Sequence, residues 1–438
     1  PNIIFIQLES FFDVGYEKNL QFSEDPLPVF HSLQKKYSSG LVTVPTVGAG
    51  TVNTEFEILT GMRQHDFGVS EYPYKTVLKS KTSESICTDL KKLGYSTHAV
   101  HNNEATFYGR NTVFSNIGFD TFCSMEYMNG LTDSPNGWSN DDVLSREIMK
   151  TLDSTSGPDF TMAITVQSHG KYDGIALDDP TIKVTGAPEG KEQAYEYYVN
   201  EIHEVDRMID TLIKELSNRK EETVLVLYGD HLPSLDIQKD DLSNANLYQT
   251  QYVVWDNMNL KKKTKNLHAY QLYAEVLDRI QIHEGMITKY HQQTKHRSKL
   301  YLTGLTTLSY DLLYGDNYAY DGENPFKQTE LQMGTEPVKL TSVQKTKSGY
   351  RVVGSGFTPY CKVYYDGTLV EAEWISSECL QLQDEFELDE ADKKDSGEPE
   401  TEVTEPRDVP NAFVVEVQSD DGVVLSSTQA YPASQVKK

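Results

Sequence analysis

The 438-residue sequence has few cysteines, a shortage of basic residues and no long hydrophobic run. Its four cysteines, Cys87, Cys123, Cys361 and Cys379, include no CxxC pair, which argues against a zinc–thiolate site. Cys361 and Cys379 fall in one β-rich region and could form a disulfide bond. So few cysteines are compatible with either a reducing or an oxidising compartment.

Basic residues are outnumbered, since 40 lysines and arginines face 66 aspartates and glutamates, for a net charge of −26. This balance argues against non-specific nucleic-acid binding, which needs a basic surface, so we expect no nucleic-acid partner. It also argues against simple electrostatic docking on an anionic membrane. Residues 384–408 contain 12 acidic and three basic residues. That density is too high to pack, so we expect a solvated acidic loop over about 384–410 rather than a store of cations.

No apolar run reaches the roughly 18 residues of a membrane-spanning helix, and the start of the chain does not have the pattern of a signal peptide. The sequence begins at Pro1, without a methionine, and enters a hydrophobic strand pattern at once. We therefore expect an upstream part of the protein to be missing from this chain.

Hydrophobic runs that end in polar residues recur along the first three quarters of the chain. The run "NIIFIQLES" at the start is typical of a central parallel strand. Similar runs lie at 96–101, 160–169, 223–231 and 251–256, and helical patterns occur at 83–94, 140–153, 191–218 and 268–280. The alternation predicts a doubly wound α/β fold with a mainly parallel sheet and a ligand site at the carboxyl ends of its strands.

The pattern changes near residue 330 to short runs of alternating apolar and polar residues separated by turn glycines. This period predicts a small all-β sandwich of immunoglobulin-like type. We therefore expect a catalytic domain over 1–328 and a C-terminal β domain over 335–438, with the acidic loop inside the latter.

Polar residues at the expected strand ends are the candidates for a functional site. Glu9 ends the first strand, His101 the second, His169 the third and Asp230-His231 the fourth. Thr51 begins the helical pattern "TVNTEFEILTG". Strand ends of a parallel sheet converge on one edge, so these side chains are expected to meet there.

Each of these residues also has an ordinary explanation. Glu9 could cap a helix, Thr51 could be only an N-cap, and His101 and His169 could be imidazoles at the solvent edge. A charged Asp230-His231 pair directly after a hydrophobic strand is harder to explain in this way. The joint placement of all these residues on strand ends favours a functional site.

Two carboxylates and an imidazole offer oxygen and nitrogen ligands without a thiolate, a set that suits Mn²⁺, Mg²⁺ or Zn²⁺. A metal beside Thr51 would lower the pKa of its hydroxyl and make it an available nucleophile. Gly48 and Gly50 allow close approach of the backbone, and a helix N-terminus favours an incoming anion. Thr51 is thus a candidate nucleophile for a phosphate or sulfate ester.

Five segments together carry a resemblance to a known family: "FIQLES", "TVNTEFEILTG", "HNNEATFYGR", "VQSH" and "LYGDHLP". Over about residues 1–325 the chain resembles the extracellular catalytic domain of lipoteichoic acid synthases, in the sulfatase and alkaline-phosphatase-like superfamily. The resemblance implies a fold of that type. It also implies several N-terminal transmembrane helices upstream, and hence a place at the extracellular face of a bacterial membrane.

The resemblance further implies that Glu9, Thr51, Asp230 and His231 hold one divalent ion, usually Mn²⁺. Thr51 would take glycerol phosphate from phosphatidylglycerol and pass it to a glycerol-phosphate polymer or glycolipid acceptor. His169 could protonate the leaving diacylglycerol. The residues implied to surround the phosphoglycerol are His101, Asn103, Phe107, Tyr108, Arg110 and His169.

The sequence departs from the family at Asn103 and Tyr108, where the best-known members carry Asp and Trp. These departures bear on the glycerol contacts and the acceptor, but leave the metal ligands intact. A guanidinium fork at Arg110 suits a phosphate, although a surface arginine is the alternative. The segment "GSGFTPYCKVYYDG" in the C-terminal domain is similar to IPT/TIG modules, which usually pack or bind rather than catalyse.

Other activities of the superfamily fit the residues less well. A sulfatase needs a cysteine or serine that becomes formylglycine, and threonine at position 51 cannot. A two-metal phosphatase or phosphodiesterase needs further ligands, for which only Asp236 and His268 are loose candidates. A hydrolase that releases glycerol phosphate to water, and a non-catalytic domain that binds cell-wall polymer, remain as alternatives.

Overall fold

The computed structural model describes residues 1–68, 70–383, 386–388 and 405–437. The chain forms two compact units. The first comprises Pro1–Asn102, Tyr108–Asp120 and Thr132–Leu331, and the second comprises Asn103–Phe107, Thr121–Leu131 and Gln332–Lys438. Two short segments from the middle of the chain thus belong to the second unit, a feature that the sequence pattern does not indicate.

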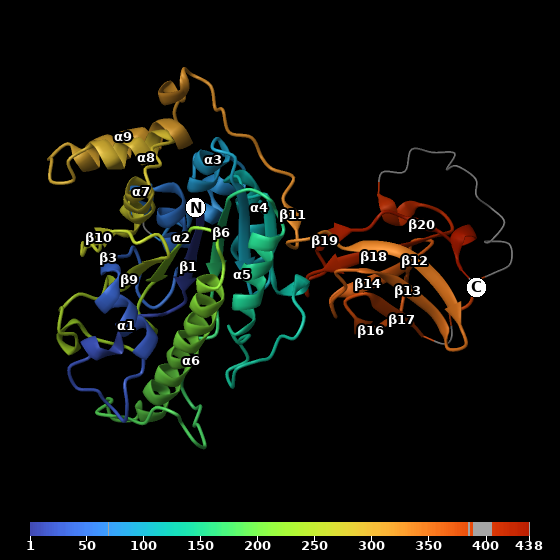
Figure 1. Ribbon diagram of the computed structural model, residues 1–438, viewed down its shortest axis with the longest axis horizontal. Coiled ribbons are helices and arrows are strands. Elements are labelled where there is room, and N and C mark those ends of the chain that lie inside the picture. The colour runs from blue at the N-terminus through green and yellow to red at the C-terminus, as the bar shows by residue number, and fades with distance from the viewer. Residues whose placement is uncertain (69, 384–385, 389–404, 438) are drawn as a thin grey trace. The chain divides into compact units, whose positions relative to one another are not determined.

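A mixed β-sheet forms the centre of the first unit (Figure 1). Its strands follow the order β10 (Leu267–His268), β3 (Ser38–Thr43), β9 (Gln249–Asp256), β8 (Thr223–Gly229), β1 (Asn2–Leu8), β6 (Asp159–Ile164) and β4 (Ser96–His101). Strand β1 lies between β6 and β8 and runs parallel to both. All seven of its residues are buried, which explains its continuous hydrophobic run.

The expectation of a mainly parallel sheet needs one correction, at β9. This strand runs antiparallel to both of its neighbours, β8 and β3. The connection from β8 to β9 contains only the short 3₁₀ turn Lys239–Asp241. Parallel neighbours are usually joined through a crossover helix, and this connection contains none, in keeping with a chain that turns back on itself. The hydrophobic run at 251–256 predicts the strand correctly but not its direction.

The helices of the first unit form two groups that pack among themselves (Figure 1). One group contains α1 (Pro28–Lys36), α5 (Val143–Asp153) and α6 (Glu192–Ser217). The other contains α2 (Thr51–Thr60), α3 (Ile86–Lys91), α7 (Ala269–Arg279), α8 (Met286–Gln293) and α9 (Tyr301–Leu313), while α4 spans Arg110–Asn116. This is the α/β arrangement that the alternating pattern predicts. No helix in the described part of the chain combines the length and hydrophobicity needed to cross a bilayer.

The second unit contains two antiparallel sheets. One has the order β12 (Lys339–Thr346), β13 (Gly349–Ser355), β17 (Cys379–Leu382) and β16 (Ala372–Ser376). The other has the order β15 (Thr368–Val370), β14 (Cys361–Tyr365), β18 (Ala412–Gln418) and β19 (Val424–Ser427), and β20 (Tyr431–Pro432) also pairs with β18. The strand pair β5 (Thr121–Cys123) and β11 (Gln332–Met333) is parallel and also belongs to this unit.

The sequence left open whether Cys361 and Cys379 form a disulfide, and the structure shows that they do not, since all four cysteines are free thiols. Cys361 begins β14 and Cys379 begins β17, so the two residues lie in different sheets of the second unit. Most of the expected acidic loop at 384–410 lies outside the described residues.

Candidate active site

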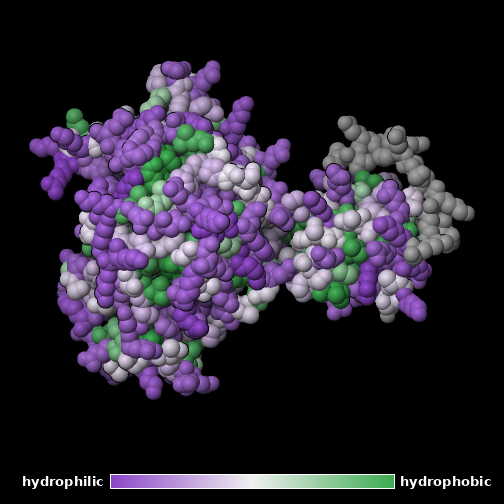
Figure 2. All heavy atoms as spheres, in the orientation of Figure 1, coloured by the Kyte–Doolittle hydropathy of each residue, from purple (hydrophilic) through white to green (hydrophobic). Residues whose placement is uncertain are grey.

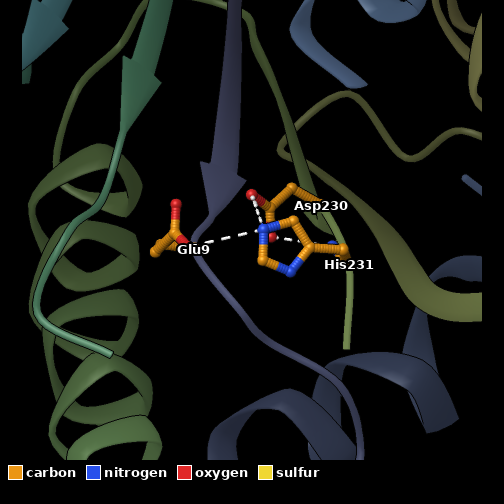
Figure 3. A group of neighbouring side chains, drawn as sticks. All are labelled: Glu9, Asp230 and His231. Carbon is orange, nitrogen blue, oxygen red and sulfur yellow. Dashed lines mark hydrogen bonds and ion pairs between the residues drawn. The ribbon is translucent and has the colours of Figure 1, made fainter. Parts of the chain in front are cut away.

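Glu9, Asp230 and His231 form a buried cluster at the carboxyl edge of the sheet (Figure 3). Glu9 directly follows β1, and Asp230 and His231 directly follow the neighbouring strand β8. One ligand atom from each residue lies within 4.8 Å of the others. The His231 Nε2 is 3.3 Å from Asp230 Oδ2 and 3.6 Å from Glu9 Oε1. Adjacent strand ends thus bring together the ligand set predicted from the sequence.

The polar atoms of this cluster fit a divalent cation. Asp230 Oδ2 is buried and has no hydrogen-bond partner among the described residues, whereas Oδ1 accepts from the amides of Ser10 and His231. The Nδ1 of His231 lies 2.8 Å from the Leu232 carbonyl and would donate to it, which leaves the Nε2 lone pair for a metal. Burial and the negative charge of Glu9 raise the pKa of Asp230 well above its ordinary value. A cation among these groups would relieve the repulsion between the two carboxylates.

Thr51 is the first residue of α2, and its hydroxyl donates to Glu9 Oε2 at 2.9 Å. The same hydroxyl lies 3.5 Å from His231 Nε2. The N-cap is Gly50, so the alternative that Thr51 is only a capping residue is wrong. Gly50 has a φ of 90°, and a Cβ there would lie 2.9 Å from Thr46. Glycine is therefore required at the turn that presents the Thr51 hydroxyl to the cluster.

Neighbouring polar groups hold Glu9 and Asp230 in place. Ser10 Oγ donates to Glu9 Oε1 at 2.9 Å, and the Glu9 amide donates to Thr165 Oγ1 at 2.8 Å. On α2, Thr54 Oγ1 donates to the Asp230 carbonyl at 2.8 Å. Helix α2 is thus tied to β8 one turn after Thr51. Ser10 directly follows Glu9 in the sequence, but hydroxyl side chains at strand ends are too common to predict this role.

Arg110 is a buried residue, so the alternative of a surface arginine is wrong: its side chain is 1% exposed. It forms an ion pair with Glu55, whose side chain is fully buried, with Nη2 at 2.5 Å from Oε2. Burial raises the pKa of Glu55, and the Arg110 guanidinium opposes that rise. The Nη1 of Arg110 is buried and has no hydrogen-bond partner among the described residues. This free donor fits an anion such as a phosphoryl oxygen.

Glu55 is a residue that the sequence search did not assign to the site. It lies four residues after Thr51, one helical turn further along α2 and on the same side of the helix. This four-residue spacing in a predicted helix is the sequence feature that could have indicated that Glu55 lies near the site. It places the carboxylate that holds Arg110 on the helix that presents the candidate nucleophile.

Tyr108 and His101 lie beside Arg110. The Tyr108 ring centroid is 5.5 Å from the Arg110 guanidinium carbon, and the ring stacks on Tyr72 at 6.0 Å. His101 ends β4, and its Nδ1 lies 2.8 Å from the Ile164 carbonyl. Burial, together with the positive charge of Arg110, lowers the pKa of His101 well below its ordinary value. His101 is therefore neutral near pH 7 and, with its Nδ1–H donating to that carbonyl, offers the lone pair of Nε2.

His169 does not end a strand, because β6 ends at Ile164 and His169 lies in the following loop. Its Nδ1 lies 2.6 Å from the Gly170 carbonyl. Its ring centroid is 4.4 Å from that of Trp138, whose Nε1 donates to the same carbonyl at 2.8 Å. Trp138 comes from the loop before α5 and was not predicted from the sequence, because no local pattern links it to residues 160–169.

Asn103 and Phe107 belong to the second unit, whereas Tyr108 and Arg110 belong to the first. The Asn103 carbonyl accepts from the Met125 amide at 3.1 Å, within the second unit. Phe107 is 38% exposed. Within the first unit the structure therefore gathers Glu9, Thr51, Asp230 and His231, and it places Tyr108 against Arg110, whose charge also acts on His101.

A comparison with solved structures shows that the fold is shared with a phosphoglycerol transferase. The phosphoglycerol transferase GacH of Streptococcus pyogenes, solved with sn-glycerol-1-phosphate, superposes with a TM-score of 0.63 at 22% identity. The match covers 75% of this chain and 90% of that chain. The sequence adds the family: the sulfatase model matches residues 1–322, so the chain belongs to the sulfatase family.

Two relatives in sequence carry names that refer to a glucan or to lipoteichoic acid. A Rhizobium meliloti protein named for cyclic beta-1,2-glucan modification is 31% identical over 281 residues, 60% of this chain and 43% of the relative. Lipoteichoic acid synthase 2 of Bacillus subtilis is 24% identical over 199 residues, 44% of this chain and 30% of the relative. The chain thus spans less than half the length of these relatives.

Proposed function

We propose that residues 1–328 form the catalytic domain of a metal-dependent phosphoglycerol transferase, and residues 335–438 an accessory β domain. The enzyme would act at the extracellular face of a bacterial membrane. The single observation that carries the proposal is the Thr51 hydroxyl at a helix start, 2.9 Å from a carboxylate of the buried Glu9–Asp230–His231 cluster. That arrangement suits a covalent threonyl intermediate better than a formylglycine or a two-metal site.

Glu9, Thr51, Asp230 and His231 would hold one divalent ion, for which we propose Mn²⁺, with Mg²⁺ or Zn²⁺ as alternatives of similar ligand preference. When bound, the ion would supply Lewis-acid chemistry that lowers the pKa of the Thr51 hydroxyl. The remaining chemistry falls to the side chains. The hydrogen bond to Glu9 Oε2 orients Thr51 Oγ1, and the N-terminus of α2 favours the negative phosphoryl group.

Thr51 Oγ1 would attack the phosphorus of phosphatidylglycerol as its proton passes to Glu9 Oε2, and the bond from phosphorus to the diacylglycerol oxygen would break. Protonated His169 would donate its Nε2 proton to that oxygen, because its Nδ1–H is already directed to the Gly170 carbonyl and Nε2–H is left for the substrate. A hydroxyl of the acceptor would then attack the same phosphorus and give its proton to His169. The bond from phosphorus to Thr51 Oγ1 would break, and Oγ1 would regain its proton from Glu9. Arg110, oriented by Glu55, would bind a phosphoryl oxygen through Nη1 in both steps.

We propose that His101 and Tyr108 contact the glycerol part, and the contacts of Asn103 and Phe107 remain predictions from the family resemblance. Neutral His101 can accept a hydrogen bond from a glycerol hydroxyl, which a protonated imidazole cannot. The acceptor is proposed to be a glycerol-phosphate polymer or a glycan. A glycan acceptor is favoured by the relative named for glucan modification, and a polymer by the lipoteichoic acid synthase.

Release of diacylglycerol tests the proposal. Phosphatidylglycerol is presented in detergent micelles with Mn²⁺, and products are identified by mass spectrometry with and without a glucan or glycerol-phosphate acceptor. We expect diacylglycerol from the wild type and none from Thr51→Ala, with an unchanged circular dichroism spectrum. Full turnover in Thr51→Ala would refute the proposal. Free glycerol phosphate in the presence of acceptor would instead identify a hydrolase.

A further inference from the structure

The region around α9 differs in charge from the rest of the chain. Residues 286–310 contain four lysines or arginines and no aspartate or glutamate, in a chain with a net charge of −26. Three of these bases, Lys295, Arg297 and Lys299, lie in the exposed loop between α8 and α9. Charge on distant acidic residues is screened beyond about 8 Å at physiological salt, so the local sign decides what this loop attracts.

Large hydrophobic side chains are exposed beside these bases. Leu300 is 73% exposed, Leu302 41% and Tyr310 63%. A groove of about 510 Å³ lined by Arg297, Leu302 and Lys265 joins the basic and apolar side chains. Figure 2 shows hydrophobic side chains among hydrophilic ones in the part of the first unit where Figure 1 draws α8 and α9. An isolated exposed leucine is ordinary, but Leu300 and Leu302 flank the first residue of α9 directly after the three exposed bases.

We propose that the α9 surface, made of Lys295, Arg297, Lys299, Leu300, Leu302 and Tyr310, docks on an anionic lipid bilayer. Tyrosine at the headgroup level, leucine inserted below it and lysine or arginine paired with lipid phosphates are the composition of interfacial elements. Asp311 is the one acid within α9, and it already accepts hydrogen bonds from the amides of Tyr318 and Ala319. The Asp311 carboxylate therefore lies against the backbone of the segment that follows the helix.

The α9 surface is connected to the candidate active site through the segment after α2. Thr306 Oγ1 on α9 donates to Asp66 Oδ2 at 2.9 Å. The ring of Tyr314, which follows α9, lies 6.2 Å from that of Phe67, and Phe67 lies 5.3 Å from Phe56 on α2. Helix α2 begins at Thr51. Docking would therefore hold the bilayer against α9, which contacts Asp66 and Phe67. Phe67 in turn packs on α2, the helix that presents Thr51.

The docking inference stands apart from catalysis, so vesicle binding tests it without turnover. The chain is sedimented with vesicles of phosphatidylcholine containing one quarter phosphatidylglycerol, and with vesicles of phosphatidylcholine alone. We expect binding to the anionic vesicles that weakens as salt is raised. Combined reversal by Lys295→Glu, Arg297→Glu and Lys299→Glu should weaken it by roughly a hundredfold or more, at about fivefold for each charge.

Matched variants separate the α9 surface from net charge. Arg207→Glu, Lys214→Glu and Lys220→Glu change the net charge equally at exposed positions on or just after α6, and should leave vesicle binding intact. Leu300→Ser with Tyr310→Ser should weaken binding without changing net charge. Equal losses in the α6 and loop variants, or no preference for anionic vesicles, would overturn the proposal. Thr51→Ala should still bind vesicles, because docking does not involve the nucleophile. A wild type that binds vesicles but transfers no glycerol phosphate would therefore count against the proposed function and not against docking.

Discussion

Replacement of Glu55 by glutamine gives a quantitative test of the buried pair with Arg110. Both side chains are almost fully removed from solvent, and the guanidinium reaches the carboxylate with Nε and Nη2. Loss of one partner from such a pair costs about 3–5 kcal/mol, because a charge is left buried without compensation. Glutamine keeps one acceptor oxygen, so we expect about 3 kcal/mol. For a unit of roughly 315 residues this corresponds to a fall in Tm of about 4–5 °C.

The assay is urea unfolding followed by tryptophan fluorescence, for Glu55→Gln, Arg110→Gln and the double variant. In the double variant both charges are absent, so its loss of stability should be smaller than the sum of the two single losses by about 2 kcal/mol or more. If the two residues did not interact, the loss in the double variant would equal the sum of the two single losses. Additivity within about 0.5 kcal/mol would therefore refute the ion pair and, with it, the argument that Glu55 orients Arg110.

Three further predictions follow from other parts of the first unit. Ser10→Ala removes the hydroxyl that donates to Glu9 Oε1. The affinity for Mn²⁺, measured by calorimetry, should fall about tenfold to a hundredfold. Unchanged affinity would contradict a metal role for Glu9. Thr51→Ser keeps a hydroxyl and should retain measurable transfer where Thr51→Ala has none; equal activity of the two variants would contradict the nucleophile. Hydrogen bonds to Asp13 and Asp25 raise the pKa of His31 to about 9, so its contribution to stability is complete below about pH 6.5 and is lost as pH rises through 9. His31→Gln should therefore lower the unfolding free energy at pH 6 by at most about 3 kcal/mol, because solvent screens this partly exposed ion pair, and by little at pH 10. An equal loss at both pH values would contradict a positive charge on His31.

Much of the fold follows from local patterns in the sequence. The runs around residues 2–8 and 223–229 are continuous and hydrophobic because β1 and β8 are buried throughout, and helix α6 shows its period over 26 residues. The direction of each strand and its neighbours in the sheet were harder to predict. Strand β9 is buried along most of its length, as the parallel strands β1 and β8 are, and only the lack of a crossover helix before it indicates that it is antiparallel to β8.

The metal-ligand candidates could be predicted because each directly follows a recognisable strand or begins a helix. Glu9 and Asp230 need only the knowledge that β1 and β8 are parallel neighbours. Arg110 and Glu55 are 55 residues apart, and nothing local in the sequence indicates that both are buried together. His169 and Trp138 meet through two loops, and loop conformation depends on tertiary contacts that periodicity does not record.

The central claim is that the Thr51 hydroxyl becomes covalently attached to glycerol phosphate. Intact-mass spectrometry after incubation with Mn²⁺ and phosphatidylglycerol, without acceptor, tests this most directly. We predict an added mass of one glycerol phosphate on the wild type, mapped by peptide sequencing to Thr51, and no added mass on Thr51→Ala. An adduct that persists in Thr51→Ala, or a wild type that turns over lipid with no adduct under rapid acid quench, would contradict the account.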